Sequence, residues 1–312
     1  MPAQLALVTD STAYLPQDVI DRHRIAVVPL SVVVADAVLT EGVEISPKDV
    51  AEALRTKQRL TTSRPNPETF AAAYRAAAEA GATGVVSVHL SGELSGTAEA
   101  AVLAAAEAPI PVRVVDSRLV GMALGYPVLA AAEARDAGLD LDGVAAAARR
   151  RAELTRGYFY VDTLEHLRRG GRIGAARALI GSALAVKPLL HLEGGRIEPL
   201  EKVRTASRAI ARLEELAVEQ AGEGAVDITV HHLAAEDRAE PLAARLRERV
   251  PGLRSLYVTE VGAVIGAHVG PGLLAVVVSG VPGDGGGSAG AGASEGEAGT
   301  SETGAGTSEG EA

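Results

Sequence analysis

The sequence predicts an α/β protein of two domains, with a parallel sheet in the first. Apolar segments alternate with helical segments through residue 155, and small polar residues directly follow several of the apolar segments. After residue 156 the pattern changes to glycine turns and a hairpin. We therefore expect an N-terminal α/β domain over residues 1–155 and a C-terminal α+β domain over residues 156–281. Residues 282–312 are mostly Gly, Ala, Ser, Thr and Glu, so we expect a disordered low-complexity tail.

The composition excludes several classes of protein. The chain has 312 residues, no cysteine, 3% aromatic residues and a formal net charge of −10 at pH 7. Six acidic residues lie in the tail, which has no Lys or Arg, and removing their charge leaves about −4 for the rest. An acidic chain with few aromatic residues is unlike a nucleic-acid-binding protein. The N-terminus lacks the basic segment and apolar run of a signal peptide, so we expect a cytoplasmic protein.

In the first half, strands are expected at apolar segments and helices at capped or alanine-rich segments. The strands are 5–9, 25–34 (interrupted by Pro29), 84–88 and 112–115, and the helices are 16–22, 47–56, 67–80, 97–107, 119–135 and 141–155. The strongest helix start is Ser46 followed by Pro47 and Asp49, which supply a cap, a first-turn proline and a first-turn acid. Residues 61–67 are rich in hydroxyls and prolines and are expected to form a loop.

In the second half, helices and strands follow a less regular order. The expected strands are 158–161, 186–192, 196–200, 225–231, 254–259, 261–268 and 273–278, and the expected helices are 164–169, 174–185, 205–220 and 236–249. Residues 193–195, Glu-Gly-Gly, are expected to form a hairpin turn. Pro199 indicates that the strand after this turn is irregular or lies at a sheet edge.

The segment from His89 to Thr97 connects a predicted strand to a predicted helix and contains glycines and hydroxyls. Such a loop directs backbone N–H and side-chain O–H groups at one point, beside the positive end of a helix dipole. It suits a carboxylate or a phosphate. The alternative is that Ser95 or Thr97 caps the helix, and the spacing alone leaves both interpretations open.

Two further polar segments follow predicted strands of the first half. They are Asp10–Thr12 and Asp116–Ser117. Ligands bind parallel sheets at the carboxyl ends of the strands, where these segments and the 89–97 loop are expected to meet. For Asp116–Ser117 we favour loop closure and capping over ligand binding.

Common enzyme signatures are absent from the sequence. A nucleophile elbow requires Gly-x-Ser-x-Gly, but in Gly92–Gly96 the serine comes one place too late. No lysine follows the glycine frame of a Walker loop, and Gly170–Gly174 lacks the dinucleotide spacing. His231 and His232 are neighbours on a predicted strand, so they face opposite sides and cannot chelate one metal. The candidate groups that remain are hydroxyls and isolated polar side chains. They can bind a carboxylate at one end of an apolar cavity.

Eight motifs occur in order between residue 5 and about residue 280. They are Val8–Thr12, Thr61–Pro65, Leu90–Thr97, Val114–Ser117, Leu164–Ile173, Lys187–Pro188, Glu201–Thr205 and Ile265–Gly272. In these motifs the chain resembles the DegV proteins, the fatty-acid-binding subunits of bacterial fatty acid kinase. The resemblance implies a two-domain DegV-like architecture with one long-chain fatty acid buried between the domains.

The resemblance also implies roles for particular residues. The fatty acid carboxylate would be held by hydroxyl and imidazole groups, namely Thr62, Ser91, Ser95 and His268. Neighbouring residues would support them, namely Ser63, Gly92 and Arg172. Ser95 either binds the carboxylate or orients the loop, and Arg172 either closes the site or braces its turn. Arg204 is the candidate for docking a kinase.

On this resemblance the chain is a non-catalytic lipid-binding subunit that serves phospholipid metabolism. Its partners would be a long-chain fatty acid and a kinase subunit that uses ATP and magnesium to make acyl phosphate, with transient membrane contact allowed and no nucleic acid. It needs no cofactor beyond the bound fatty acid. The residues leave one enzymatic alternative, a hydrolase or acyl transferase with Ser91 or Ser95 as nucleophile and His268 as base. Asp10 or Asp116 would then be the third member.

Overall fold

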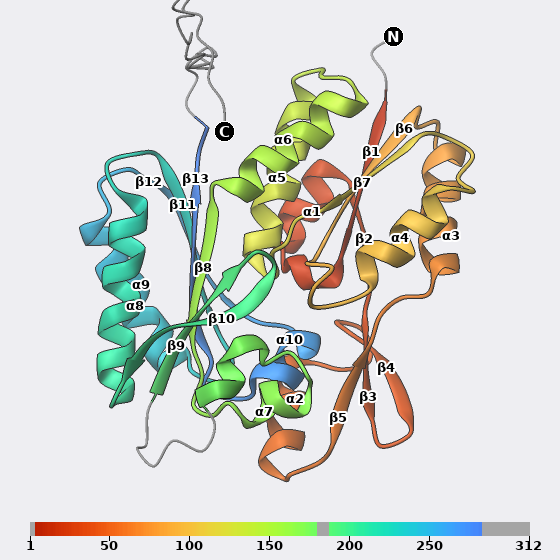
Figure 1. The fold of residues 1–312 in the computed structure, drawn as a ribbon. Coiled ribbons are helices and arrows are strands. Elements are labelled where there is room, and N and C mark those ends of the chain that lie inside the picture. The colour runs from red at the N-terminus through yellow and green to blue at the C-terminus, as the bar shows by residue number, and fades with distance from the viewer. Residues whose placement is uncertain (1–3, 180–186, 283–312) are drawn as a thin grey trace, which may run out of the picture. The chain divides into compact units, whose positions relative to one another are not determined.

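The computed structural model describes residues 4–179 and 187–282, and Figure 1 shows their arrangement. Within these residues the strands form three sheets. The expected disordered tail, apart from Pro282, lies outside the described residues. The predicted fold class is confirmed, because a parallel sheet forms in the N-terminal part and a separate sheet with helices forms C-terminally. The domain boundaries themselves stay a prediction.

The first sheet is the predicted parallel sheet. Its strand order is β2-β1-β6-β7, and all its pairs are parallel. The strands are β1 (Leu5–Asp10), β2 (Ile25–Val28), β6 (Gly84–His89) and β7 (Val112–Asp116), and the helices beside them are α1 (Gln17–His23), α3 (Pro67–Glu79), α4 (Thr97–Ala105), α5 (Met122–Asp136) and α6 (Leu141–Glu153). β6 is buried along its whole length, as expected for a central strand covered on both faces.

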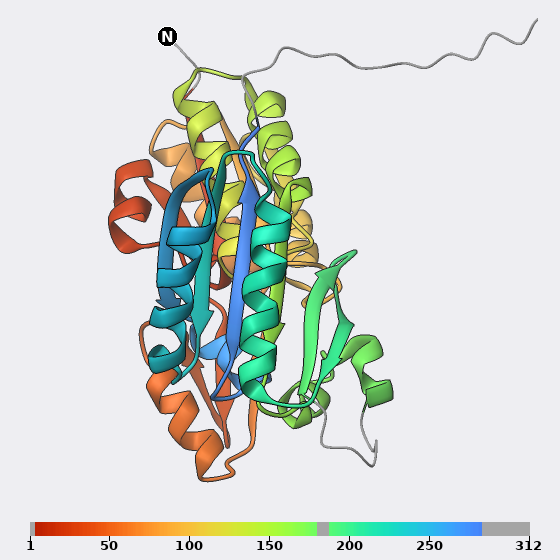
Figure 2. The ribbon, with the colours of Figure 1, turned by 90° about the vertical axis from the view of Figure 1, so that its left-hand side faces the viewer.

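The second sheet is mixed and has the strand order β10-β9-β8-β13-β11-β12. Its strands are β8 (Thr155–Tyr160), β9 (Lys187–Glu193), β10 (Arg196–Val203), β11 (Val226–His232), β12 (Leu253–Glu260) and β13 (Leu274–Gly280). Figure 2 shows α8 (Ala206–Ala221) and α9 (Glu236–Arg249) lying along one face of it. The predicted hairpin forms between β9 and β10, and its register shifts after Pro199, which confirms the expected irregularity.

Helix α5 packs against strands of both sheets, β1 and β6 on one side and β8 and β13 on the other. Every residue from Met122 to Val128 is buried. A helical segment that is buried all round belongs in a core, and this one lies between strands of two sheets. The largest cluster of buried side chains surrounds it. The space enclosed between the two sheets therefore depends on this helix.

A third, small sheet has the order β4-β3-β5 and is antiparallel. It is formed by β3 (Ser31–Val34), β4 (Ala37–Thr40) and β5 (Leu60–Ser63), and α2 (Pro47–Arg55), α7 (Glu165–Arg169) and α10 (Ala263–Val269) lie near it. Helix α2 begins as predicted, with a complete capping box between Ser46 and Asp49. β4 has no counterpart among the predicted elements.

Three sequence predictions are wrong in detail. Residues 60–63 form strand β5 rather than a loop, because they pair with β3. Residues 263–269 form helix α10 rather than a strand: Glu41, remote in sequence, accepts a hydrogen bond from the Val264 N–H at its first turn (2.8 Å). In the segment expected to be helix 174–185, residues 174–179 are a 3₁₀-helix, and residues 180–186 lie outside the described part.

Candidate functional site

A cavity of about 520 Å³ lies between the two larger sheets, beside α5 and α10. Its wall is largely apolar and draws on the second and third sheets and on the segments that follow β1 and β6, with Leu30, Leu90, Phe159, Leu192, Leu273 and Val277 among its lining residues. This size falls within the range of small-molecule pockets, roughly 300–1,000 Å³. The cavity is therefore suited to a largely apolar small molecule.

Polar groups gather in one region of this cavity. The Thr62 hydroxyl on β5 and the Nε2 of His268 on α10 lie 2.8 Å apart, and both residues line the cavity. Burial, with the nearby charge of Arg172, lowers the pKa of His268 to about 4. The imidazole is therefore neutral at pH 7. It forms a hydrogen bond with Thr62 and adds no charge to the cavity.

The loop between β6 and α4 is attached to the same region by two arginines. Arg64 donates to the Gly96 carbonyl (3.1 Å), and Arg172 donates to the Leu94 carbonyl (3.0 Å). Between these two anchored carbonyls lies Ser95, whose side chain lines the cavity and whose hydroxyl is 2.9 Å from that of Thr97. A β-carbon at Gly96 would lie 2.0 Å from the Arg64 guanidinium, so this close approach requires glycine.

The helix-capping interpretation of this loop is wrong. The N-cap of α4 is Gly96, and no side chain caps the helix there. Because the Ser95 and Thr97 hydroxyls lie beside each other rather than on the first N–H groups of α4, the Ser95 hydroxyl is placed at the cavity wall.

Ser91, which the sequence favoured as a ligand contact, lies elsewhere. It is fully buried, donates to the Gly195 carbonyl (2.7 Å) and accepts from the Glu93 N–H (3.2 Å). It is absent from the residues that line the cavity. Contact with a ligand would require its hydroxyl to leave Gly195, so this role stays a prediction.

Of the predicted supporting residues, some line the cavity and one does not. Ser63 lines the cavity next to Arg64, and its hydroxyl donates to the Arg64 carbonyl (3.2 Å). Gly92 lies in the loop, and its N–H donates to Asp116 (3.2 Å). Arg172 lines the cavity and also donates to the Gly170 carbonyl (2.7 Å), so it braces its own turn. Arg204 is exposed just beyond the end of β10.

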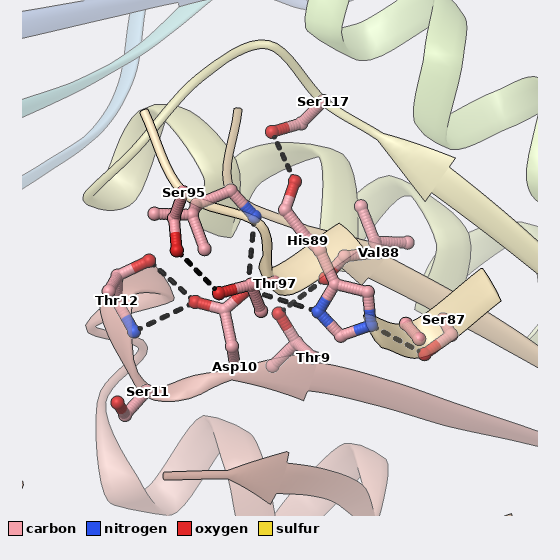
Figure 3. A network of polar contacts seen from close by, with 12 residues as sticks. Thr9, Asp10, Ser11, Thr12, Ser87, Val88, His89, Ser95, Thr97 and Ser117 are labelled. Atoms are coloured by element: carbon pink, nitrogen blue, oxygen red, sulfur yellow. Dashed lines mark hydrogen bonds and ion pairs between the residues drawn. The ribbon is translucent and has the colours of Figure 1, made fainter. Parts of the chain in front are cut away.

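The polar strand ends meet as predicted, and Figure 3 shows their network. The fully buried Asp10 carboxylate accepts hydrogen bonds from the Thr12 N–H (3.1 Å), the Leu90 N–H (3.0 Å) and the Thr12 hydroxyl, and contacts His89 Nδ1 (3.0 Å). The other His89 nitrogen lies 2.6 Å from the Ser87 hydroxyl. This network holds the ends of β1 and β6 together behind the cavity loop.

Asp116 and Ser117 close a loop, which is the interpretation that we favoured. Asp116 accepts from the Arg118 N–H (2.8 Å), and Ser117 donates to the His89 carbonyl (2.8 Å).

Sequence reasoning missed two cavity residues. His231 on β11 lines the cavity, and its Nε2 accepts a hydrogen bond from the Met122 N–H at the start of α5 (2.9 Å). Complete burial lowers its pKa to about 4. Nothing in the sequence indicates this, because the contact joins residues far apart in the chain. Arg64 lies within the Thr61–Pro65 motif, which was an available indication of its role.

The enzymatic alternative requires a serine within hydrogen-bonding distance of His268. In the described part of the chain, the hydroxyl partner of His268 is Thr62, whereas Ser95 contacts Thr97 and Ser91 contacts Gly195. His268 Nδ1 is buried and finds no hydrogen-bond partner there, so no carboxylate orients the imidazole as a base. The geometry suits binding better than nucleophilic catalysis.

Across residues 4–179 and 187–282, no cluster of three or more His, Asp or Glu side chains is arranged to hold a metal ion. None of the helices in those two ranges combines the length and the apolar character needed to cross a membrane.

Comparison with known proteins shows the family of this chain. The family model described as "Uncharacterised protein, DegV family" matches residues 4–280. The chain belongs to the DegV family. A DegV domain-containing protein of Streptomyces coelicolor is 66% identical over 279 residues, which cover 89% of this chain and 99% of that protein. Protein DegV of Bacillus subtilis is 36% identical over 278 residues, 87% of this chain and 98% of that protein.

Solved DegV structures share the fold. A fatty-acid-binding DegV family protein from Thermus thermophilus superposes with a TM-score of 0.85 at 37% identity, covering 89% of this chain and all of that one (100%). The fatty-acid-binding DegV of Bacillus subtilis gives 0.83 at 35% identity, with coverage of 89% and 100%. DegV proteins similar to this chain in both sequence and structure therefore bind fatty acids.

Proposed function

We propose that this protein binds one long-chain fatty acid in the cavity between its two larger sheets and presents the carboxylate to a partner kinase, which phosphorylates it to acyl phosphate. The observation that carries the proposal is a largely apolar cavity that contains the paired polar groups of Thr62 and His268. The fatty-acid-binding relatives support it. The protein is then a carrier, and the catalytic groups, ATP and magnesium belong to the partner.

The apolar wall accounts for the affinity. Burying an acyl tail of about 15 methylene groups, at about 0.8 kcal/mol each, contributes on the order of 10 kcal/mol before the costs of association. The polar contacts then set the orientation of the ligand more than its affinity. An inverted fatty acid would bury its carboxylate against apolar side chains, which is strongly unfavourable.

Thr62, Ser95 and His268 are the proposed carboxylate partners. All three line the cavity, Thr62 beside His268 and Ser95 in the loop that Arg64 and Arg172 hold. A neutral His268 that donates through Nε2 to Thr62 leaves the Thr62 hydroxyl proton free to donate to a carboxylate. Arg64 and Arg172 also line the cavity and supply positive charge beside this group. The carboxylate would accordingly bind ionised.

Arg204 is proposed as a contact for the kinase. It is exposed beside β10, whose hairpin with β9 reaches the cavity loop through the hydrogen bond from Ser91 to Gly195. Arg204 lies at the end of β10 away from this turn, so a kinase that contacts both Arg204 and the loop that carries Ser95 would lie along the hairpin. Transient contact with a membrane would supply or receive the fatty acid.

The binding half of the proposal is tested by native mass spectrometry of the purified protein, followed by denaturing extraction and lipid analysis. We expect one fatty acid per chain, either co-purified or taken up after delipidation. A delipidated protein that takes up no fatty acid would refute the proposal. A serine-directed fluorophosphonate should leave Ser91 and Ser95 unlabelled, and labelling would favour the hydrolase alternative.

The presentation half is tested with a fatty acid kinase subunit, ATP and hydroxylamine, which traps acyl phosphate. We expect the double variant Thr62→Ala/Ser95→Ala to bind fatty acid but to lower acyl phosphate formation by about 10-fold or more, since about 1.4 kcal/mol of lost positioning equals a factor of ten. Thr40→Ala/Thr259→Ala, which removes two hydroxyls at residues outside the cavity lining, is the matched control. Unchanged turnover in the double variant would contradict the assigned carboxylate contacts.

A further inference from the structure

A second pocket, of about 350 Å³, opens on the other side of the polar region of the cavity. Its lining comes from the end of α2, from β5, from α7 and from α10, and includes Lys57, Arg59, Thr61, His166, Arg169 and Gly170. None of the proposed carboxylate contacts lies in it.

The charged side chains that line this pocket are all positive. Three of its lining residues, Lys57, Arg59 and Arg169, are cationic, and no acidic residue lines it. Arg169 pairs with Glu165 at 2.8 Å, whereas Lys57 and Arg59 have no ion pair with any residue of the described part of the chain. The carbonyls at the end of α2 do not compensate, because Leu54 and Ala53 already accept hydrogen bonds from the N–H groups of Lys57 and Gln58. The pocket therefore has a net positive potential.

The two pockets share a wall. β5 contributes Thr61 to the basic pocket and Thr62 to the cavity, and α10 contributes Ala267 to the first and His268 to the second. Gly170 lines the basic pocket and packs directly on the His268 ring, since a β-carbon there would lie 2.1 Å from its Nδ1. Strand β5 and helix α10, with the His268 ring, thus separate a basic pocket from the polar region of an apolar cavity.

We propose that the basic pocket binds a phosphate group. An ammonium and a guanidinium that lack acidic partners are the groups by which proteins most often hold phosphate oxygens, and the Gln58 amide and Thr61 hydroxyl add neutral donors. Two sources supply this chemistry: free inorganic phosphate, and the phosphorylated head of the ligand in the cavity. The second source rests on the proposed function, whereas the site itself does not.

The test measures inorganic phosphate binding to the fatty-acid-loaded full chain by calorimetry at constant ionic strength. We expect saturable binding at one site. The variant Lys57→Asn/Arg59→Gln should weaken it by about 10-fold or more, because two charge-assisted contacts are lost. Asparagine suits position 57, where φ is +60°. The control is Lys48→Gln/Arg55→Gln, which removes the same charge from helix α2 at residues outside the pocket lining.

The outcomes separate clearly. Loss of phosphate binding in the pocket variant alone, with fatty acid uptake unchanged, supports the site. Equal weakening in the control variant, or no saturable binding in the unmodified protein, would overturn it. A long-chain acyl phosphonate identifies the source. If it binds more tightly than the fatty acid, and only when Lys57 and Arg59 are present, the pocket receives the phosphorylated head; if it gains nothing while phosphate still binds, the ligand is free phosphate.

Discussion

Gly170→Ala tests whether the position of His268 depends on the wall between the two pockets. Gly170 ends α7 with φ −73° and ψ −9°, an ordinary helical conformation, so alanine carries no backbone strain there. Its β-carbon, however, would lie 2.1 Å from His268 Nδ1 and 2.8 Å from Cε1. Ordinary contacts between such atoms are about 3.5 Å or longer. The imidazole must therefore move by roughly 1 Å or more, which breaks its 2.8 Å contact with Thr62.

The expected cost combines two effects. Overpacking of a filled site typically costs about 1–3 kcal/mol, and the lost hydrogen bond adds about 1 kcal/mol. We expect the free energy of unfolding, measured by urea denaturation, to fall by about 2–4 kcal/mol. If His268 positions the carboxylate, the dissociation constant for a long-chain fatty acid should rise by about 10-fold as well.

Gly224→Ala is the control for this prediction. A β-carbon at Gly224 meets nothing within 4 Å, and its φ is not in the left-handed region, so its stability should be nearly unchanged. The double variant Gly170→Ala/His268→Ala should recover most of the loss, because the imidazole that clashes is gone. A Gly170→Ala protein as stable as the Gly224→Ala protein, or strictly additive effects in the double variant, would refute the reasoning.

Three further predictions concern the buried polar groups and the cavity. Asp10→Ala should lower the free energy of unfolding by about 3–5 kcal/mol in urea denaturation, since it leaves His89 and several buried N–H and O–H donors unpaired; a loss below 1 kcal/mol would contradict the role given to the network. Stability should fall as the pH is lowered from 7 to 5. His231 and His268 have folded pKa values of about 4, below the value of about 6.5 in the unfolded chain. Between pH 7 and 5 the unfolded state therefore binds protons that the folded state does not. This lowers the free energy of unfolding by about 1–2 kcal/mol for each histidine. The double variant His231→Gln/His268→Gln should flatten this pH dependence, and an unchanged slope would refute it. Ala275→Phe, placed in the cavity wall, should weaken binding of long-chain more than of medium-chain fatty acids in a competition assay, and equal weakening would contradict its place in the cavity.

Local sequence determined much of the fold. The capping box at Ser46 and Asp49 satisfies the first N–H groups of α2 from within the same turn. The apolar run of β6 and the Glu-Gly-Gly turn before β10 likewise carry their own conformational preference. The predictions that failed depend on distant partners. Residues 263–269 include Val and Ile that favour a strand, yet the carboxylate of Glu41 fixes the first turn of a helix there.

The candidate site was likewise predictable only in part from the sequence. The sequence alone indicated that hydroxyls at strand ends would gather near a loop rich in glycine, because parallel strands bring their carboxyl ends to one edge. It also pointed to Thr62, Ser95 and His268, through motifs that resemble those of the family. Only the tertiary structure decided that Ser91 donates to Gly195 while Ser95 lines the cavity, that His231 forms part of the wall, and that Lys57 and Arg59 lie behind His268. The physical reason is that local sequence gives each segment a conformational preference, whereas its final pairing and the direction and partners of its side chains are fixed by segments that arrive from elsewhere in the chain.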